Sequence, residues 1–509
     1  MPRPHRLSTL GLRGAVVPEQ IADRDFGYDQ ARHLLWRAGF GGTPPQIRAL
    51  AQMGPEAAVD FLLDARDPEP SLPGFIDRNV IRPYTPEERL AYAQARQRRD
   101  EDTLARLREQ RQQQQRRDRR QMRDTQHWWL ARMIQSPAPL QEKMALFWHG
   151  HFATSYRTIE DAYHMALQNA MFRELGLGNF GDLLYRIIRD PAMLAYLDQN
   201  DSRVDAPNEN LAREIMELFA LGVGNYGEGD IKAGARALTG YTFRDDEFVF
   251  EPDNHDGGNK RILGSVGNFD GDGFVTRILS QRACASFVCR KLYRFFAADL
   301  PPDAASGGMD LPRDTREMIR TMETELTMQR YNLRPVLRRL FLSEHFYSDA
   351  VVGSQIKSPA VLVAGAIRSL NTPARDVSVL LDAMDRMGQN LFFPPSVKGW
   401  DGGRAWINTA TLFVRQNALV YLLTGRMPDQ QASTETGFDP LPLLADLGDD
   451  AAKPNAAIDY LLKLTLGGTP EGPRQELRAF MNRYDLPVNR DSVTGLLLLI
   501  TAMPEYQLT

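Results

Sequence analysis

The same helix-opening pattern recurs along most of this 509-residue chain. A capping residue precedes a proline, and apolar residues then follow at three- and four-residue spacing, as at Ser136-Pro137, Asp190-Pro191 and Ser358-Pro359. Side chains at that spacing share one face of a helix, so each such segment carries an apolar face that must be buried. The pattern therefore predicts a mainly α fold, a large multi-helix globular protein.

The strongest strand signal lies in a short insert at about 241–265. Phe243, Phe248 and Phe250 surround one polar turn, and a glycine-containing turn follows near Asn254. We expect one or two small β-hairpins at this place among the helices.

Composition divides the chain into four segments. Residues 1–29 are interpreted as an N-terminal extension, 30–425 as the main helical domain, 426–455 as a loop or linker, and 456–509 as C-terminal helices packed on the main domain. Within the main domain, residues 86–134 are expected to form a solvated charged helix. Residues 94–124 contain eleven arginines and six acids but few apolar side chains.

Charge and hydropathy exclude several classes of function. The net charge is -4, from 61 basic and 65 acidic residues, so no global field attracts nucleic acid or an anionic membrane. The arginine-rich stretch has no interleaved aromatic residues, which favours a solvated helix over a nucleic-acid contact. No window reaches the ~18 apolar residues of a membrane span. The chain is expected to be cytoplasmic as written, or exported if a leader is missing from it.

Common catalytic signatures are missing from the sequence. It contains no nucleophile elbow, phosphate-binding glycine loop or dinucleotide fingerprint, which argues against serine hydrolase, nucleotide-dependent and Rossmann chemistry. Cys284 and Cys289 lie about 140° apart around a predicted helix, so we expect buried core residues and no disulfide between them.

Histidines gather in two neighbouring segments. His149 and His151 can share a metal only from irregular or extended backbone, for example if Gly150 ends the helix that precedes it. His164 follows on the next helix, where Asp161 is interpreted as a helix cap that could also be a ligand. The alternative for the paired histidines is an ordinary role as hydrogen-bonded core or surface residues.

Three further segments carry candidate functional side chains. Arg213, Glu214 and Glu217 form a polar stripe that is either a row of ion pairs or an acid and base held by arginine. His255 and Asp256 occupy a glycine-flanked turn and could join a metal site. The tryptophans of a proline- and glycine-rich loop, Trp400 and Trp406, are either core anchors or a platform for a sugar ring.

Together these residues lead to two hypotheses. The first is an enzyme, hydrolytic or oxidative, that uses a divalent metal ion bound by histidine and carboxylate. Its predicted metal ligands are His149, His151, His164, His255 and Asp256; its predicted catalytic residues are Arg213, Glu214 and Glu217; and Trp400 and Trp406 bind the ligand. The second is a non-catalytic helical scaffold or polymer-binding protein, in which the same charges form a buried ion network.

Several of these segments occur in the same order in one bacterial family, the domain of unknown function 1800. They include HLLWRAGFGGTP (33–44), KMALFWHGHFATS (143–155), PNENLAREIMELFALGVG (207–224), IKSP (356–359) and PPSVKGWDGGRAWIN (394–408). The chain resembles members of this family over residues 30 to about 425. The resemblance implies no assigned activity. It does imply a protein partner of sulfatase-like or phosphatase-like fold.

Overall fold

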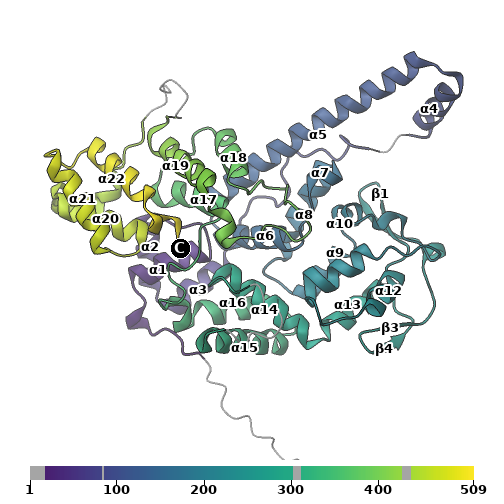
Figure 1. Cartoon of the computed structure of the whole chain (residues 1–509), viewed down its shortest axis with the longest axis horizontal. Coiled ribbons are helices and arrows are strands. Elements are labelled where there is room, and N and C mark those ends of the chain that lie inside the picture. The colour runs from purple at the N-terminus through teal and green to yellow at the C-terminus, as the bar shows by residue number, and fades with distance from the viewer. Residues whose placement is uncertain (1–17, 83–84, 302–310, 427–436) are drawn as a thin grey trace, which may run out of the picture.

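Helices form most of the molecule, as the sequence predicts, and two small antiparallel sheets are present in the described residues. The computed structural model describes residues 18–82, 85–301, 311–426 and 437–509. Parts of the expected N-terminal extension and of the expected linker, residues 1–17 and 427–436, lie outside the described residues. Figure 1 shows α6 and α17 near the centre, with α19–α22 at one end and the strands at the other.

The α-helices have the following bounds: α1 Tyr28–Arg37, α2 Pro44–Met53, α3 Pro55–Asp64, α4 Pro86–Arg98, α5 Glu101–Gln135, α6 Pro139–His151, α7 Tyr156–Ile159, α8 Ala162–Leu175, α9 Phe180–Ile187, α10 Pro191–Tyr196, α11 Asn210–Glu214, α12 Glu228–Ala237, α13 Gly271–Leu279, α14 Arg282–Phe296, α15 Arg313–Met328, α16 Leu333–Phe341, α17 Pro359–Leu370, α18 Val377–Arg386, α19 Thr409–Thr424, α20 Pro454–Leu466, α21 Glu471–Arg483 and α22 Arg490–Ala502. Two shorter elements are the π-helix η3 Ile215–Ala220 and the 3-10 helix η7 Gly403–Trp406. A further 3-10 helix, η8 Leu441–Ala452, occupies part of the segment expected to be a loop.

Side-chain caps explain where several helices begin. The Asp190 carboxylate accepts a hydrogen bond from the backbone N–H of Met193 at 3.0 Å, and the Ser358 hydroxyl caps α17 in the same way. Both helices begin at the proline that the sequence indicated. In contrast, α6 begins two residues after Pro137, because Ser136 is the residue that ends α5.

The predicted insert forms two hairpins. Strand β1 (Tyr241–Arg244) pairs with β2 (Glu247–Phe250), and β3 (Lys260–Ile262) pairs with β4 (Ser265–Gly267). The turn between β1 and β2 consists of Asp245 and Asp246, whose φ angles are 49° and 70°. Two consecutive residues with positive φ match the twist of a two-residue hairpin, and aspartate tolerates this region better than most residues. This turn carries Asp246 toward α8.

Helix α6 lies in the hydrophobic core, and twelve of its thirteen residues are buried. Trp148 packs between Phe152 and Phe180 with ring centroids 5.4 and 5.8 Å away. Cys284 and Cys289 are both buried and unbridged, as expected, and burial raises the pKa of Cys284 to about 12. The same core therefore surrounds the helix that carries His149 and His151.

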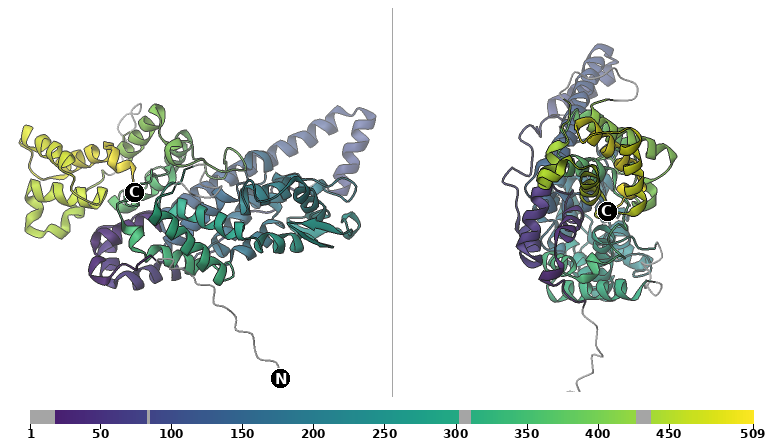
Figure 2. Two further views of the ribbon diagram at one scale, coloured as in Figure 1. Left: turned by 60° about the horizontal axis from the view of Figure 1, so that its bottom comes forward. Right: turned by 90° about the vertical axis from the view of Figure 1, so that its left-hand side faces the viewer.

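Helices α4 and α5 form an arm that projects from the body of the molecule (Figures 1 and 2). With 35 residues, α5 is about 52 Å long at ~1.5 Å per residue. At the opposite end, the last residues of the chain return to the centre, where the N–H of Lys357 donates to the carbonyl of Gln507 at 2.8 Å. No helix in the described ranges is long and apolar enough to cross a membrane.

Candidate ligand-binding site

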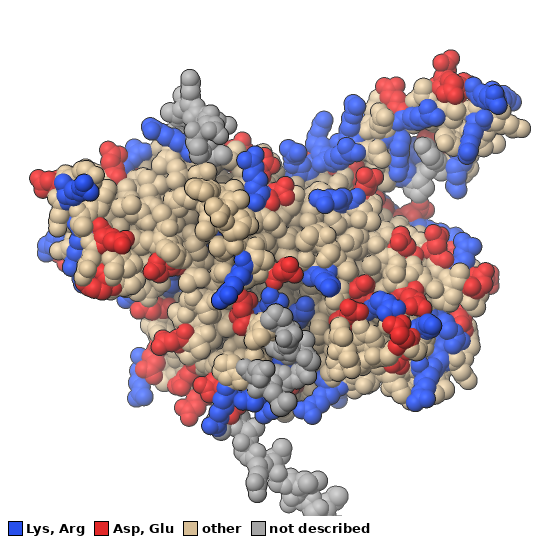
Figure 3. Space-filling view, viewed as in Figure 1, with Lys and Arg blue, Asp and Glu red and all other residues tan. Residues whose placement is uncertain are grey.

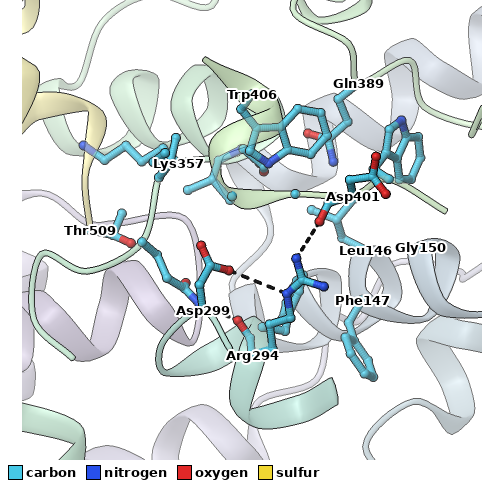
Figure 4. A pocket seen from close by; sticks show the side chains of 18 of the residues that line it. Leu146, Phe147, Gly150, Arg294, Asp299, Lys357, Gln389, Asp401, Trp406 and Thr509 are labelled. Atoms are coloured by element: carbon cyan, nitrogen blue, oxygen red, sulfur yellow. Dashed lines mark hydrogen bonds and ion pairs between the residues drawn. The ribbon is translucent and has the colours of Figure 1, made fainter. Parts of the chain in front are cut away.

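A cavity of about 190 Å³ lies where α6, α14 and two loops meet. One loop is Gln355–Ser358, before α17, and the other is residues 394–408, which we call the tryptophan loop (Figure 4). Four of the segments that carry the family resemblance contribute to its wall. The volume is far above the ~10–15 Å³ that one water requires, so a ligand of several atoms can enter.

Basic side chains dominate the charge of this cavity. The described lining residues include six basic side chains against two acidic ones, although the whole chain carries a net charge of -4. The acidic residues are Asp299 and Asp401, and the basic ones are Arg37, Lys143, Lys291, Arg294, Lys357 and Lys398. The cavity is therefore a local region of positive charge in a weakly acidic protein.

Three of the basic side chains make hydrogen bonds within the protein. The Lys143 ammonium donates to the carbonyl of Gly39 at 2.9 Å, just beyond the end of α1. The Lys357 ammonium donates to the carbonyl of Tyr506 at 2.6 Å and lies 4.2 Å from the centre of the Trp36 ring. Arg37 donates to the carbonyl of Val351 at 2.6 Å, but its buried Nε has no hydrogen-bond partner. These cations hold the cavity wall together from segments far apart in the chain.

Lys291 differs from these three cations. Its ammonium makes no hydrogen bond or ion pair with any described residue, although it lines the cavity. Burial lowers the pKa of Lys291 to about 8, with a smaller contribution from the charge of Arg294. Arg294 itself donates to the carbonyl of Asp401 at 2.7 Å and lies 3.6 Å from Asp299 (Figure 4). Lys291 and Lys398 are thus the two lining cations that are not paired with a described residue, and Lys291 is the more buried of the two.

His151 lines the same cavity. Its Nε2 lies 2.9 Å from the carbonyl oxygen of Phe219, so Nε2 carries the proton and donates. Burial, with a smaller contribution from the charge of Lys291, lowers the pKa of His151 to about 3, so the ring is neutral. Its Nδ1 is then an acceptor, and this buried atom has no partner in the described residues.

The tryptophan loop forms the opposite wall. Trp406 is buried, Trp400 is partly exposed, and both line the cavity. Gly399 lies so close to α6 that an added Cβ would come within 2.0 Å of the carbonyl oxygen of Gly150. His149 fixes the chain just before this loop, because its Nε2 accepts a hydrogen bond from the N–H of Phe392 at 3.0 Å.

The two histidines of α6 therefore point to different surroundings. The helix continues through Gly150 to His151, so the backbone break that a shared metal required is not present. Burial lowers the pKa of His149 to about 3, and its ring lies 5.3 Å from the Trp129 ring and 5.5 Å from the Trp400 ring. His149 supports the tryptophan loop and His151 contacts η3.

The predicted catalytic residues lie where α11 becomes the π-helix η3. The N–H groups of both Leu221 and Gly222 donate to the carbonyl of Met216 at 3.0 Å, which creates the wider turn. The sequence pattern was interpreted as a regular α-helix and missed this change. Gly222, whose φ is 79°, indicates in the sequence only that the helix ends, so no specific local signal marked the wider turn.

Arg213 turns away from Glu214 and Glu217. It donates to Glu209 at 3.0 Å and to Glu228 at 2.9 Å, which are partly exposed ion pairs. Glu217 accepts a hydrogen bond from the Tyr226 hydroxyl at 3.0 Å.

Glu214 is half-buried, and burial raises its pKa, helped by the charge of Glu217. Lys398 acts in the opposite direction on Glu214 and also lines the cavity.

His164 lies in a separate group with two carboxylates. Its Nε2 is 2.8 Å from Asp246, its Nδ1 is 3.7 Å from Asp161, and one ligand atom from each residue lies within 4.8 Å of the others. Asp161 also caps α8, as the sequence indicated, by accepting from the N–H of Tyr163 and His164. Burial lowers the pKa of His164, but the hydrogen bond to Asp246 and both carboxylate charges outweigh it, and the pKa is raised.

The remaining predicted metal ligands lie in an ion-paired turn. His255 Nδ1 is 2.9 Å from the carbonyl of Thr239, and both oxygens of Asp256 accept from the guanidinium of Arg236. That arginine lowers the pKa of Asp256 to about 2.

Among the described residues, Asp161, His164 and Asp246 are the one group of three ligand-type residues close enough to share an ion. Of the predicted metal ligands it contains His164 and not the other four.

These features define a class of protein: a helical protein with a basic cavity walled by tryptophans, and a separate cluster of one histidine and two aspartates. The chain belongs to the family described as protein of unknown function (DUF1800), whose profile matches residues 33–508. The resemblance seen in the sequence is thereby confirmed. Comparisons with curated proteins and with solved structures gave no match.

Proposed function

We propose that this protein binds a small anionic ring compound, such as an acidic sugar, in the cavity between α6, α14 and the tryptophan loop. One observation carries the proposal: the lining is strongly basic, and the Lys291 ammonium, which lies over the Phe287 ring, makes no hydrogen bond or ion pair with a described residue. A carboxylate, phosphate or sulfate group would supply the missing charge-assisted hydrogen bonds. Trp400 and Trp406 offer apolar ring faces of the kind on which sugars and other rings stack.

The ligand's hydroxyl groups also find a partner. The neutral ring of His151 presents an acceptor at Nδ1, which matches a hydroxyl donor. A purely inorganic ion would leave this acceptor and the indole faces unused. We therefore favour an organic ligand with one acidic group over free phosphate or sulfate.

A catalytic step remains part of the proposal through Glu214 and Glu217. Glu214, the carboxyl whose pKa is raised, would serve as the general acid, and Glu217 would act as the base. Lys398 connects this pair to the cavity, because it lines the cavity and its charge acts on Glu214. Arg213 would act on this pair through its charge, which opposes the rise in the pKa of Glu214, while its ion pairs go to Glu209 and Glu228.

Calorimetric titration with glucuronate and with glucose tests the binding proposal. Glucuronate should bind and glucose should bind at least tenfold more weakly, because the two differ in the acidic group that faces Lys291. Lys291→Met should lose the preference, whereas Lys232→Met, at an exposed lysine of α12, should keep it. Equal binding of the two sugars, or no binding of glucuronate, glucose 6-phosphate and glucose 6-sulfate, would overturn the proposal.

A second candidate is the metal-dependent enzyme, and the group of Asp161, His164 and Asp246 favours it. A zinc or manganese ion held there would supply a Lewis acid or an activated water for hydrolysis or oxidation. The competing interpretation of this group is a protonated histidine between two carboxylates. Zinc titration with elemental analysis separates them: one equivalent bound by the wild type and lost in His164→Ala, but kept in His255→Ala, supports the metal site, and no specific binding excludes it.

The non-catalytic alternative is a scaffold or polymer-binding protein acting with a partner of sulfatase-like or phosphatase-like fold. This partner remains a proposal that follows from the family resemblance. In that case the cavity would bind an acidic group of the polymer. The double variant Glu214→Gln with Glu217→Gln would then bind glucuronate as the wild type does.

A further inference from the structure

Five arginines on α5 form an exposed patch that the cavity does not explain. Between residues 116 and 123, each arginine is exposed, and none makes an ion pair or hydrogen bond with a described residue. We call this the arginine patch; its members are Arg116, Arg117, Arg119, Arg120 and Arg123. Figure 3 shows basic side chains gathered where the projecting arm leaves the body of the molecule.

The acidic residue inside this run is turned away from the arginines. Asp118 is buried, with one oxygen accepting from the Tyr156 hydroxyl at 2.7 Å and the other from the N–H of Ala162 at 3.0 Å. Gln121, on the same side of α5, exchanges two hydrogen bonds with the backbone of Asp77 at 2.9 and 3.1 Å. These contacts fix α5 to the body, so the arginine patch is held in place with five positive charges against one neighbouring exposed acid, Asp124.

Like charges face one another within the arginine patch. Arg116 and Arg120, and Arg119 and Arg123, are four residues apart on the helix, a spacing at which like charges repel by about 0.2–0.5 kcal/mol per pair. An acidic partner would remove this repulsion, because its carboxylates would neutralise the arginines.

We propose that the arginine patch is the docking surface for an acidic protein partner that presents clustered aspartate and glutamate side chains. This inference goes beyond the cavity and does not depend on it. Guanidinium groups match carboxylates in a bidentate geometry, which favours arginine over lysine at such contacts. The five arginines span only about 10 Å at ~1.5 Å per residue, a length that fits a compact cluster of carboxylates.

A long polyanion fits less well. Nucleic acid would extend beyond the patch over a molecule whose net charge is -4, and no aromatic side chain is interleaved to stack with bases. A vesicle surface would need several such patches on one face, or an apolar segment beside them.

Binding to poly-L-glutamate, measured by fluorescence anisotropy at low and moderate salt, tests the proposal. The variant with all five patch arginines changed to glutamine should bind at least tenfold more weakly than the wild type. The control variant makes the same charge change on the same arm, at exposed arginines outside the patch: Arg96, Arg98, Arg99, Arg106 and Arg108. It should bind as the wild type does.

Three outcomes would overturn the assignment. Equal loss of binding in both variants would show a diffuse charge effect, and no binding by the wild type would exclude the surface. Tighter binding of duplex DNA or of phosphatidylserine vesicles, lost in the patch variant alone, would assign the patch to that partner instead. Thermal unfolding of the patch variant provides the folding control, and its midpoint should equal or exceed that of the wild type.

Discussion

Single buried cations shape the behaviour of this protein at the residue scale. Lys143 is buried beside the end of α1, and its ammonium faces two backbone carbonyls, those of Gly39 and Trp36. Burial, with a smaller contribution from Arg37, lowers the pKa of Lys143 to about 7. The folded protein therefore binds this proton less strongly than the unfolded chain, whose lysines titrate near 10.4.

This difference predicts how stability changes with pH. Between about pH 7 and pH 10 the unfolded chain binds more protons at this position, so the contribution of Lys143 to the free energy of unfolding rises with pH. Below pH 7 the cost of the buried charge is fully present. Chemical denaturation at pH 7 and pH 9 should show that this rise is smaller in Lys143→Met, by about 1 kcal/mol per pH unit across the interval. An unchanged rise would contradict the assignment.

The hairpin of β1 and β2 makes the clearest contact between elements. Its turn carries Asp246, which accepts from Arg78 and lies 2.8 Å from His164 on α8. The pKa of His164 is raised, so its stabilising contribution is present below the unfolded value of about 6.5 and is lost as the pH rises through the folded value.

Replacement of Asp246 by asparagine tests this contact. Asparagine tolerates the φ of 70° at this position, so the turn should be kept while the charge is removed. At pH 6 the variant should be less stable by about 1.5–3 kcal/mol, the range for a hydrogen bond to a charged group, and the loss should be smaller at pH 9. The matched control is Asp245→Asn in the same turn, which should change stability little at either pH. A loss that does not depend on pH would argue against the ionic contact.

The tryptophan loop is the second contact between elements that can be tested. A methyl group at Gly399 would meet the backbone of Gly150 in α6, whereas one at Gly402 would find open space, its nearest neighbour being 4.0 Å away on Trp406. Both glycines have positive φ, 76° and 74°, so both alanine variants carry a backbone cost on the order of 1–3 kcal/mol. Gly399→Ala should cost at least a further 1–3 kcal/mol in chemical denaturation, because the loop must leave α6. Equal losses in the two variants would contradict this packing.

At the scale of the whole molecule, local sequence signals predicted the helices, whereas tertiary contacts determine which side chains meet at the candidate sites. Caps such as Asp190 and Asp161 act over three residues, and the hairpins follow from a short turn, so the sequence predicted them. The meeting of His164 with Asp246 joins residues 82 positions apart, and nothing local indicates it. From the sequence, the histidines were grouped because they are the same type of residue. In the structure, His149 and His151 are both buried but contact different elements, so their roles differ.

The cavity itself is a property of the whole molecule, because residues from Trp36 to Thr509 line it. A ligand that binds there should stabilise the entire fold, by about 2.7 kcal/mol at a concentration of 100 Kd. The stability of Lys291→Met relative to the wild type should differ between the ligand-free and the ligand-bound protein. Without ligand it should be more stable than the wild type by about 1 kcal/mol, because a poorly compensated cation is removed.

With glucuronate present, Lys291→Met should gain little, because the charge that holds the acidic group is gone. Thermal unfolding of the wild type, Lys291→Met and the exposed-site control Lys232→Met, each with and without glucuronate, measures both halves of the prediction. A clear loss of stability in Lys291→Met without ligand would mean that Lys291 supports the fold. The positive charge of the cavity would then need no ligand to explain it, and the binding proposal would lose its main support.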